Sequence, residues 1–339
     1  MKVITFGEIM LRLAPHGYYR FTQANDLEAT FGGGEANVAV SLANFGLDAA
    51  FVTKLPAHDI GQCAVNDLRK YGVDTSMITR GGDRVGIYYL EKGASQRASQ
   101  VIYDRAHSAI SEAEPKDFKW GDIFADADWF HFTGITPALS DKTANITLEA
   151  CKAAKEEGLT ISCDLNFRKK LWNSEKAGRI MGQLMQYVDV CIANEEDAEK
   201  VFGIKAADTD ITSGTLNQNG YIDVARQLTK RFGCKAVAIT LRESISASDN
   251  NWAAMLYTDN KAYFSKKYAM HIVDRVGGGD SFGAGLIYAM LMKKDPQQTI
   301  EFAVAASCLK HTIEGDYNRV GVKEVENLAN GDGSGRVQR

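Results

Sequence analysis

The sequence lacks several features by which common classes of protein are recognised. Its six cysteines include no CxxC pair, which argues against a zinc site or a disulfide framework and favours free thiols in a reducing cytoplasm. No stretch approaches the ~20 apolar residues of a membrane span, and the N-terminus carries no cleavage site. With 39 Lys and Arg against 43 Asp and Glu, no basic excess indicates a nucleic-acid surface. We therefore expect a cytoplasmic protein that engages neither nucleic acid nor membrane.

Two common nucleotide-binding motifs are also missing. No segment reads GxxxxGK followed by Ser or Thr, so the chain is not a P-loop enzyme. No segment reads GxGxxG, which counts against an NAD-linked dehydrogenase.

What is present is a regular alternation of apolar and amphipathic segments. The 339 residues, 45% of them hydrophobic, suffice for a large core. Buried strands are expected at residues 3–9, 49–55, 129–135, 159–166, 188–194 and 236–240. Helices are expected at residues 37–46, 61–72, 147–158, 179–188 and 221–233. This order predicts an α/β fold with a mostly parallel sheet and helices on both faces.

Two segments interrupt this alternation. Residues 12–33 show little helical periodicity, and residues 83–107 contain the strand-like runs GIYYLE and SQVIYDR around a polar turn, which predicts a hairpin. We expect the two segments to form a small β lid on a core made of residues 1–11, 34–82 and 108–330. The polar tail, residues 331–339, is expected to be disordered.

Residues 274–291, DRVGGGDSFGAGLIYAML, place three glycines and an aspartate at the start of a predicted helix. Free N–H groups at a helix N-terminus hold anions, and glycines let the backbone approach phosphate oxygens closely. The carboxylate of Asp280 would stay ionised there and could accept a proton from a hydroxyl group. The arrangement suits phosphoryl transfer, and the alternative is a tight turn with Asp280 as the N-cap.

A second glycine cluster, GGGEANVAVSLANFG at residues 32–46, precedes another predicted helix. Together with DRVGGGDSFGAG, it resembles the paired signatures of the ribokinase-like (PfkB) sugar kinases. The resemblance implies a doubly wound α/β core, a β lid that often makes a dimer contact, and transfer of the ATP γ-phosphate to a sugar hydroxyl with Mg²⁺. It also allows a monovalent cation such as K⁺. By resemblance, Gly277, Gly278 and Gly279 form the anion hole and Asp280 is the base.

The nucleotide side carries both matches and departures. The resemblance assigns nucleotide binding to Asn166, Arg168, Asn194, Thr240, Gly277 and Gly279. Asp197 would lie near Mg²⁺ and act through water, although NEEDAEKVFG also reads as a helix with an acidic first turn. Three positions depart from the usual family residues, namely Pro56, Arg242 and Arg275.

A sugar acid requires a fixed cation, and the planar fork of arginine binds a carboxylate bidentately. Arg105 lies two residues from Tyr103, so both share one face of the second lid strand, and Tyr89 lies in the partner strand. Arg168 follows a core strand at the sheet edge where parallel α/β sheets bind ligands. The alternatives are an edge charge for Arg105, a surface charge for Arg168 and lid packing for the tyrosines.

This pattern resembles one branch of the family, the 2-keto-3-deoxygluconate kinases. The resemblance assigns the substrate site to Gly34, Tyr89, Tyr103, Arg105, Arg168, Asp280 and Asp316; a turn residue is the alternative for Asp316. We expect ATP-dependent phosphorylation of a terminal hydroxyl of a sugar acid, 2-keto-3-deoxygluconate giving its 6-phosphate. The alternatives are a kinase for a neutral sugar or nucleoside, such as fructose or ribose, and a non-catalytic sugar-binding protein.

Overall fold

The computed structural model describes residues 1–194, 196–205, 218–333 and 335. Within these residues, nine strands form one central sheet. In spatial order the strands are β14 (Lys261–Phe264), β13 (Asp249–Thr258), β12 (Ala236–Ser244), β11 (Val190–Asn194), β10 (Thr160–Asp164), β9 (Trp129–Thr133), β1 (Lys2–Phe6) and β4 (Asp48–Val52), and β15 (Tyr268–His271) also pairs with β13. Neighbours from β4 to β12 run parallel, whereas β13 pairs antiparallel with β12, β14 and β15.

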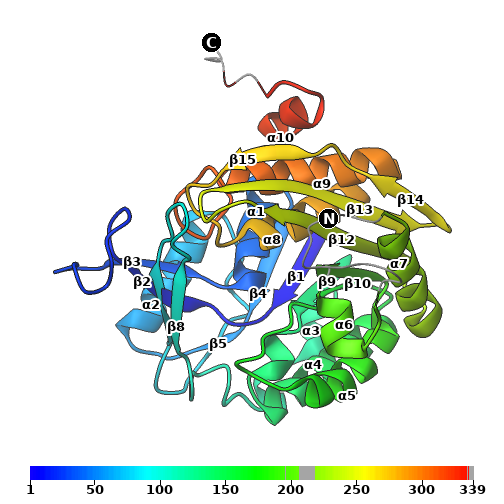
Figure 1. Ribbon diagram of the computed structural model, residues 1–339. Helices are drawn as coiled ribbons and strands as arrows, with labels where there is room; N and C mark the ends of the chain where they lie inside the picture. Colours follow the sequence, from blue (N-terminus) through cyan, green and yellow to red (C-terminus); the bar gives the residue numbers. More distant parts are fainter. Residues whose placement is uncertain (195, 206–217, 334, 336–339) are drawn as a thin grey trace.

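Helices cover both faces of this sheet, as the alternation predicts (Figure 1). One face packs against α3 (Trp120–Phe124), α4 (Asp141–Glu156), α5 (Ser174–Leu184), α6 (Asp197–Phe202) and α7 (Gln218–Phe232). The other face packs against α1 (Gly34–Asn44), α2 (Asp59–Lys70), α8 (Gly278–Leu291) and α9 (Pro296–Lys310), and α10 (Val322–Ala329) packs on α9. Each parallel crossover therefore buries an apolar face of the sheet under a helix.

Helix α8 is buried on almost every side, and its packing fixes the position of its N-terminus. It contacts both α1 and α9. Gly285 permits the close approach of α9, because a Cβ at this position would lie 2.9 Å from Cα of Ala303. Close packing on two sides leaves α8 little freedom to shift, so the glycine–aspartate turn is presented at a fixed place beside the sheet.

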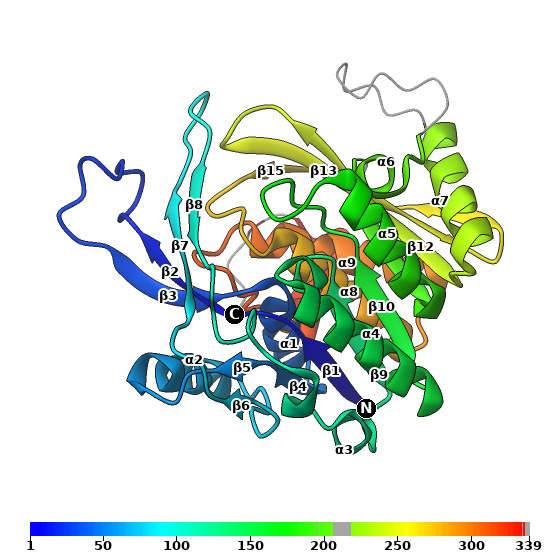
Figure 2. The ribbon, with the colours of Figure 1, turned by 90° about the horizontal axis from the view of Figure 1, so that it is seen from below.

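The lid is a second sheet that stands to one side of the core (Figure 2). Its strands, in spatial order, are β3 (Glu28–Gly32), β2 (Met10–Ala14), β7 (Gly86–Glu91) and β8 (Gln100–Asp104). The runs GIYYLE and SQVIYDR pair antiparallel as β7 and β8, and β2 begins at Met10, two residues before the predicted segment. Met10, Tyr88 and Leu90 pack against Val276, so the lid contacts the turn that precedes α8.

Smaller elements complete the chain. Strands β5 (Lys54–Leu55) and β6 (Thr79–Arg80) form a short parallel pair, and 3₁₀ turns occur at Pro115–Asp117, Thr136–Ala138 and Met185–Tyr187. None of the helices in the described residues is long and apolar enough to cross a membrane. The predicted disorder of the tail falls in part on residues 334 and 336–339, which lie outside the described residues.

Candidate active site

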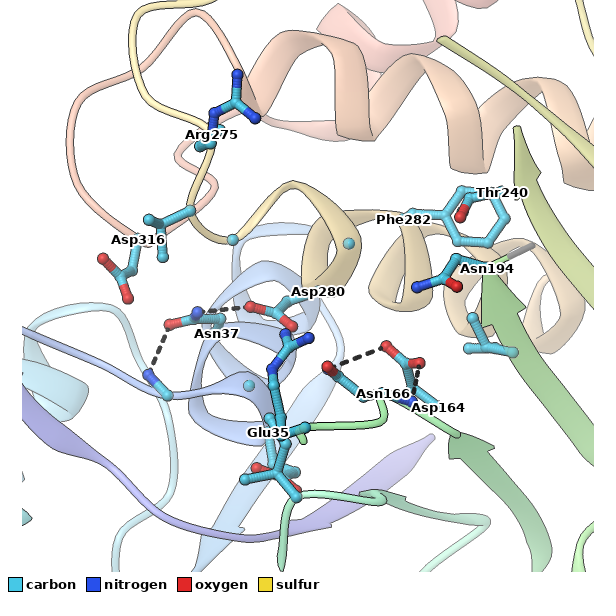
Figure 3. Close-up of a pocket in the computed structure, with 18 of the residues that line it drawn as sticks. Glu35, Asn37, Asp164, Asn166, Asn194, Thr240, Arg275, Asp280, Phe282 and Asp316 are labelled. Carbon is cyan, nitrogen blue, oxygen red and sulfur yellow. Dashed lines mark hydrogen bonds between the residues drawn. The ribbon is translucent and has the colours of Figure 1, made fainter. Parts of the chain in front are cut away.

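A cavity of about 380 Å³ opens where the lid faces the carboxyl edge of the central sheet. Its walls come from the ends of β10, β11 and β12, the N-termini of α1 and α8, and the inner face of β7 and β8. Open parallel sheets bind ligands at this edge. In Figure 3, Asp280 lies between Asp316 on one side and Asn194 and Thr240 on the other.

Asp280 is the third residue of α8 and is held by one neighbour from α1. Asn37 Nδ2 donates a hydrogen bond of 2.7 Å to Asp280 Oδ2, and Asn37 Oδ1 accepts one from the N–H of Gly33 at 3.2 Å (Figure 3). Burial raises the pKa of Asp280 to about 6, while the hydrogen bond from Asn37 acts in the opposite direction. The carboxylate is therefore ionised at neutral pH and positioned to accept a proton.

The N-cap alternative for Asp280 is wrong. The N-cap position belongs to Gly277, and no side chain of the described residues caps this helix.

The three glycines differ in how much space surrounds each of them. Gly277 has a φ of +82° and faces the Asp316 carbonyl, while a Cβ on Gly278 would lie 2.2 Å from the ring of His311. A Cβ on Gly279 would meet no described atom within 4 Å, so this position leaves room for a ligand.

The N-terminus of α1 faces the same space. A Cβ on Gly34 would lie 3.6 Å from Asp280 Oδ1, so the two glycine clusters meet at the base. The next residue, Glu35, is buried, and its Oε1 accepts hydrogen bonds from the backbone and hydroxyl of Thr133 and from the hydroxyl of Thr136. Burial raises the pKa of Glu35 to about 7. Glu35 thereby ties α1 to the end of β9.

The structure brings Tyr103, Arg105 and Arg168 to the walls of one cavity. Arg105 is not an exposed edge charge: its side chain is 10% exposed, forms an ion pair with Glu8 and lies 5.3 Å from the ring centre of Tyr103. Arg168 is exposed in the loop after β10, and its side chain forms no ion pair with any residue that the structure describes. Of these two cations, Arg105 is neutralised by a direct ion pair and Arg168 has none among the described residues.

The structure does not bring Tyr89 to the wall of this cavity. Side chains alternate along β7, which turns Tyr89 to the outer face of the lid, 6.4 Å from the ring centre of Phe21. The same alternation turns Tyr88 inward, directly opposite Tyr103 on β8, where it lines the cavity. The two adjacent tyrosines could not be told apart without knowing the face to which each points.

Asp316 is more than a turn residue. It lies in the cavity wall, accepts an ion-pair contact of 2.7 Å from Arg12, and accepts hydrogen bonds from the hydroxyl of Tyr88 at 2.6 and 2.7 Å. Arg12 also contacts Asp274 at 2.5 Å. This buried network joins the lid to the segments on either side of α8 and α9.

The residues assigned to the nucleotide also reach the cavity. Its wall includes Asn166, Asn194, Asp197 and Thr240. Asn194 Oδ1 accepts the backbone N–H groups of Glu196 and Asp197, just where α6 begins. The oxygens of Asp197 accept the N–H groups of Phe167 and Asn194 at 3.0 and 3.2 Å. Asp197 therefore braces this wall.

Two of the departures, Arg242 and Arg275, lie in the same wall. Arg275 Nη2 donates a hydrogen bond of 2.8 Å to the Ala247 carbonyl. Burial and then the nearby charge of Arg242 lower the pKa of Arg275. Two arginines that repel each other at a cavity wall favour an anionic ligand between or beside them.

The sequence model of the pfkB family carbohydrate kinases matches residues 1–320 of the chain. The chain belongs to the pfkB family of carbohydrate kinases. This confirms the resemblance, the ribokinase-like α/β fold and the assignment as a sugar kinase, and it leaves no place for the dehydrogenase alternative.

Individual members of the pfkB family are similar to this chain over nearly its full length. A 2-dehydro-3-deoxygalactonokinase from Haloferax volcanii is 33% identical over 335 residues, covering 98% of each chain. A 2-dehydro-3-deoxygluconokinase from Bacillus subtilis is 27% identical, covering 96% of this chain and 94% of the relative. The crystal structure of 2-dehydro-3-deoxygluconokinase from Thermotoga maritima superimposes with a TM-score of 0.95 at 54% identity, covering 98% of this chain and 100% of the other.

Sequence reasoning missed four side chains that shape this pfkB site: Glu8, Asn37, Asp164 and Tyr88. Asn37 stands in the first glycine signature, three residues after Gly34, and helical spacing alone would have turned it toward the same space. Glu8 has no such signal, because its partner Arg105 is 97 residues away.

Proposed function

We propose that the protein transfers the γ-phosphoryl group of ATP to the terminal hydroxyl of 2-keto-3-deoxygluconate, giving the 6-phosphate. The observation that carries this proposal is the position of Asp280. It combines a pKa raised to about 6, a fixed hydrogen bond from Asn37, and a place in the first turn of α8 beside the open space over Gly279. A base with this pKa is deprotonated at neutral pH and can take the proton of an attacking hydroxyl.

The lid supports an acid as the substrate. Arg105 and Arg168 bring two guanidinium groups to the cavity that contains Asp280. A carboxylate held by these groups would place the far end of a six-carbon chain toward α8. A neutral sugar would offer neither guanidinium group a charged partner, which favours the acid. The names of the relatives at 27–54% identity support the same class of substrate.

The opposite wall suits the magnesium complex of ATP. Arg242 and Arg275 would face phosphate oxygens, and the N–H groups at the start of α8 would stabilise negative charge as it moves. Burial and the nearby charges of Asp197 and Asp280 raise the pKa of Asp164 well above its ordinary value, and a bound cation would relieve this repulsion. Mg²⁺ would be held near Asp164 and Asp197, in part through water, and would neutralise phosphate charge.

We also propose that the enzyme is a homodimer joined through the outer face of the lid. This face exposes Leu27 and Ile102, and a groove of about 500 Å³ runs between Leu27, Tyr89 and Ile102. The loop between β2 and β3 also exposes Tyr18 and Tyr19. A small four-stranded sheet with apolar groups on its outer side gains stability when a second copy covers it.

A substrate panel tests the proposed reaction. The purified chain is supplied with ATP, Mg²⁺ and, separately, 2-keto-3-deoxygluconate, its galacto epimer, fructose and ribose. ADP release gives the rate, and phosphorus NMR locates the phosphate. We expect kcat/KM for the keto-deoxy acid to exceed that for either neutral sugar by roughly 10²-fold or more. A neutral sugar that reacts equally well would overturn the assignment, and loss of ADP release in Asp280→Asn controls for contaminating kinases.

A further inference from the structure

Lys310 is a buried lysine that the proposed reaction leaves without a role. It is the last residue of α9, and 0% of it is exposed. Its Nζ donates hydrogen bonds to the backbone carbonyls of Asp274 and Ile313, each at 3.2 Å. Among the described residues, it forms no direct ion pair with a carboxylate. Removing an ammonium group from water is unfavourable, so this arrangement needs compensation from its surroundings.

The two carbonyls belong to segments that meet beneath the anion hole. Residues 274–277 lead into α8, and residues 311–316 follow α9. The N–H of Asp274 donates to the carbonyl of His311 at 3.3 Å. A Cβ placed on Gly277 would lie 1.9 Å from the carbonyl oxygen of Asp316 and 3.3 Å from Cε of Lys310. The lysine side chain therefore passes directly below the turn that carries the glycines.

The surrounding charges favour an ammonium group at this place. Arg12 bridges Asp274 and Asp316 at 2.5 and 2.7 Å, so two cations and two carboxylates share one buried region. Burial lowers the pKa of Lys310, and the negative charges of Asp274, Asp316 and Asp280 act in the opposite direction. The positive charge of Lys310 thus balances a carboxylate that Arg12 alone would leave uncompensated.

We propose that Lys310 is a built-in monovalent cation: its ammonium group joins the two segments and supports the anion hole, so the enzyme needs no added K⁺. Carbonyl oxygens from neighbouring segments are the ligands with which proteins replace the hydration shell of K⁺. Here two such oxygens already face Nζ at 3.2 Å. Lys310 is a positioning residue, because it acts on the turn and does not touch the substrate. The proposal rests on the phosphoryl transfer proposed above.

The physical effect follows from the geometry of the peptide unit. In a trans peptide, the C=O and the next N–H point in opposite directions. When Lys310 holds the carbonyl of Asp274 inward, the N–H of Arg275 points away from it. The orientation of the turn is thereby set by a charge within the chain.

The first test uses the unaltered protein. Activity and melting temperature are measured with K⁺ replaced by tetramethylammonium at constant ionic strength. We expect kcat to change less than about twofold and the melting temperature to stay the same, since a cation supplied by the chain cannot be washed out. A tenfold or greater loss of kcat, or a specific rise of the melting temperature with K⁺, would overturn the proposal. An enzyme inactive in every salt would instead contradict the proposed function.

The second test removes the ammonium group. Lys310→Ala should lower kcat by roughly 10- to 100-fold with a smaller effect on KM for ATP, as expected when anion-hole donors are disturbed. K⁺, NH₄⁺ or methylammonium should restore activity in a saturable way and raise the melting temperature of this variant. Lys310→Met fills the same space without charge and should not be rescued. Wild-type kcat in Lys310→Met, or a folded Lys310→Ala that no cation rescues, would overturn the proposal. The melting temperature reports cation binding even where activity is too low to measure.

Discussion

Arg105 donates hydrogen bonds from both Nε, at 2.8 Å, and Nη2 to a single oxygen of Glu8, Oε2. The other oxygen of Glu8, Oε1, is buried and has no hydrogen-bond partner in the described part of the chain. The cation that the sugar-acid hypothesis needs is therefore already neutralised by a carboxylate of the protein, and an entering acid must share or displace that carboxylate.

Glu8→Gln should strengthen the binding of the acid. The amide keeps the shape of Glu8 but removes the negative charge that competes for Arg105, so KM for 2-keto-3-deoxygluconate should fall by roughly three- to tenfold. KM for a neutral sugar should change little. Steady-state kinetics on both substrates measure the ratio. A tenfold rise of KM for the acid would show that Glu8 orients Arg105 and does not compete with the substrate.

Arg105→Ala should lower kcat/KM for the keto-deoxy acid by about two orders of magnitude, because a charge-assisted bidentate contact in a closed site is lost. Activity on a neutral sugar should remain nearly unchanged. The matched control is Arg84→Ala, which removes a lid arginine paired at the surface with Asp104 at 2.9 Å. Equal losses on acid and neutral sugar in Arg105→Ala would mean that Arg105 supports the lid alone.

The core of the fold could be predicted from the sequence because its information is local. The six parallel strands are short apolar runs, and helices α2, α4, α5 and α7 have an amphipathic period. The glycines and aspartate of residues 277–280 mark the start of α8. The lid face could not be predicted, because a one-residue change of register exchanges Tyr88 and Tyr89. The buried ion pairs join residues that are far apart in the sequence: Arg12 and Asp316 are separated by 304. No local pattern indicates such a pair.

Glu35 should make the stability of the fold depend on pH. Burial raises its pKa from 4.5 to about 7 in the folded protein, so between these values the folded state binds more protons than the unfolded state. This contribution is fully present below pH 4.5 and is lost as the pH rises through 7. Glu35→Gln imitates the protonated form, so it should be more stable than wild type at pH 8 and similar at pH 4.5. Denaturant unfolding at both pH values measures the difference in the free energy of unfolding between Glu35→Gln and wild type. The same difference at pH 8 and pH 4.5 would show that Glu35 does not cause the pH dependence.

The lid interface should be sensitive to a single charge. Ile102 is 53% exposed on the outer face of the lid, so Ile102→Asp should convert a dimer into a monomer of half the mass by light scattering. Ile60→Asp is the control, since Ile60 is 48% exposed on α2, outside the lid. A monomeric wild type, or a dimer that persists in Ile102→Asp, would contradict the proposed interface.

The pH profile of the reaction should report the Asn37–Asp280 hydrogen bond. Asp280 must be deprotonated to accept the hydroxyl proton, so kcat/KM should fall as the pH decreases through about 6, the pKa of the folded enzyme. Asp280→Asn should lower kcat by roughly 10²-fold or more with ATP binding kept, because the amide cannot accept the proton.

Asn37→Ala removes the hydrogen bond that lowers the pKa of Asp280, so the acid limb of the kcat/KM profile should move to higher pH. Asn44→Ala, on the same helix but bonded to the Asn318 carbonyl at 2.7 Å, should leave the limb in place. Two results together would contradict this role of Asp280: an acid limb of the kcat/KM profile in Asn37→Ala that coincides with that of wild type, and a near-normal kcat in Asp280→Asn. A different residue would then be the base.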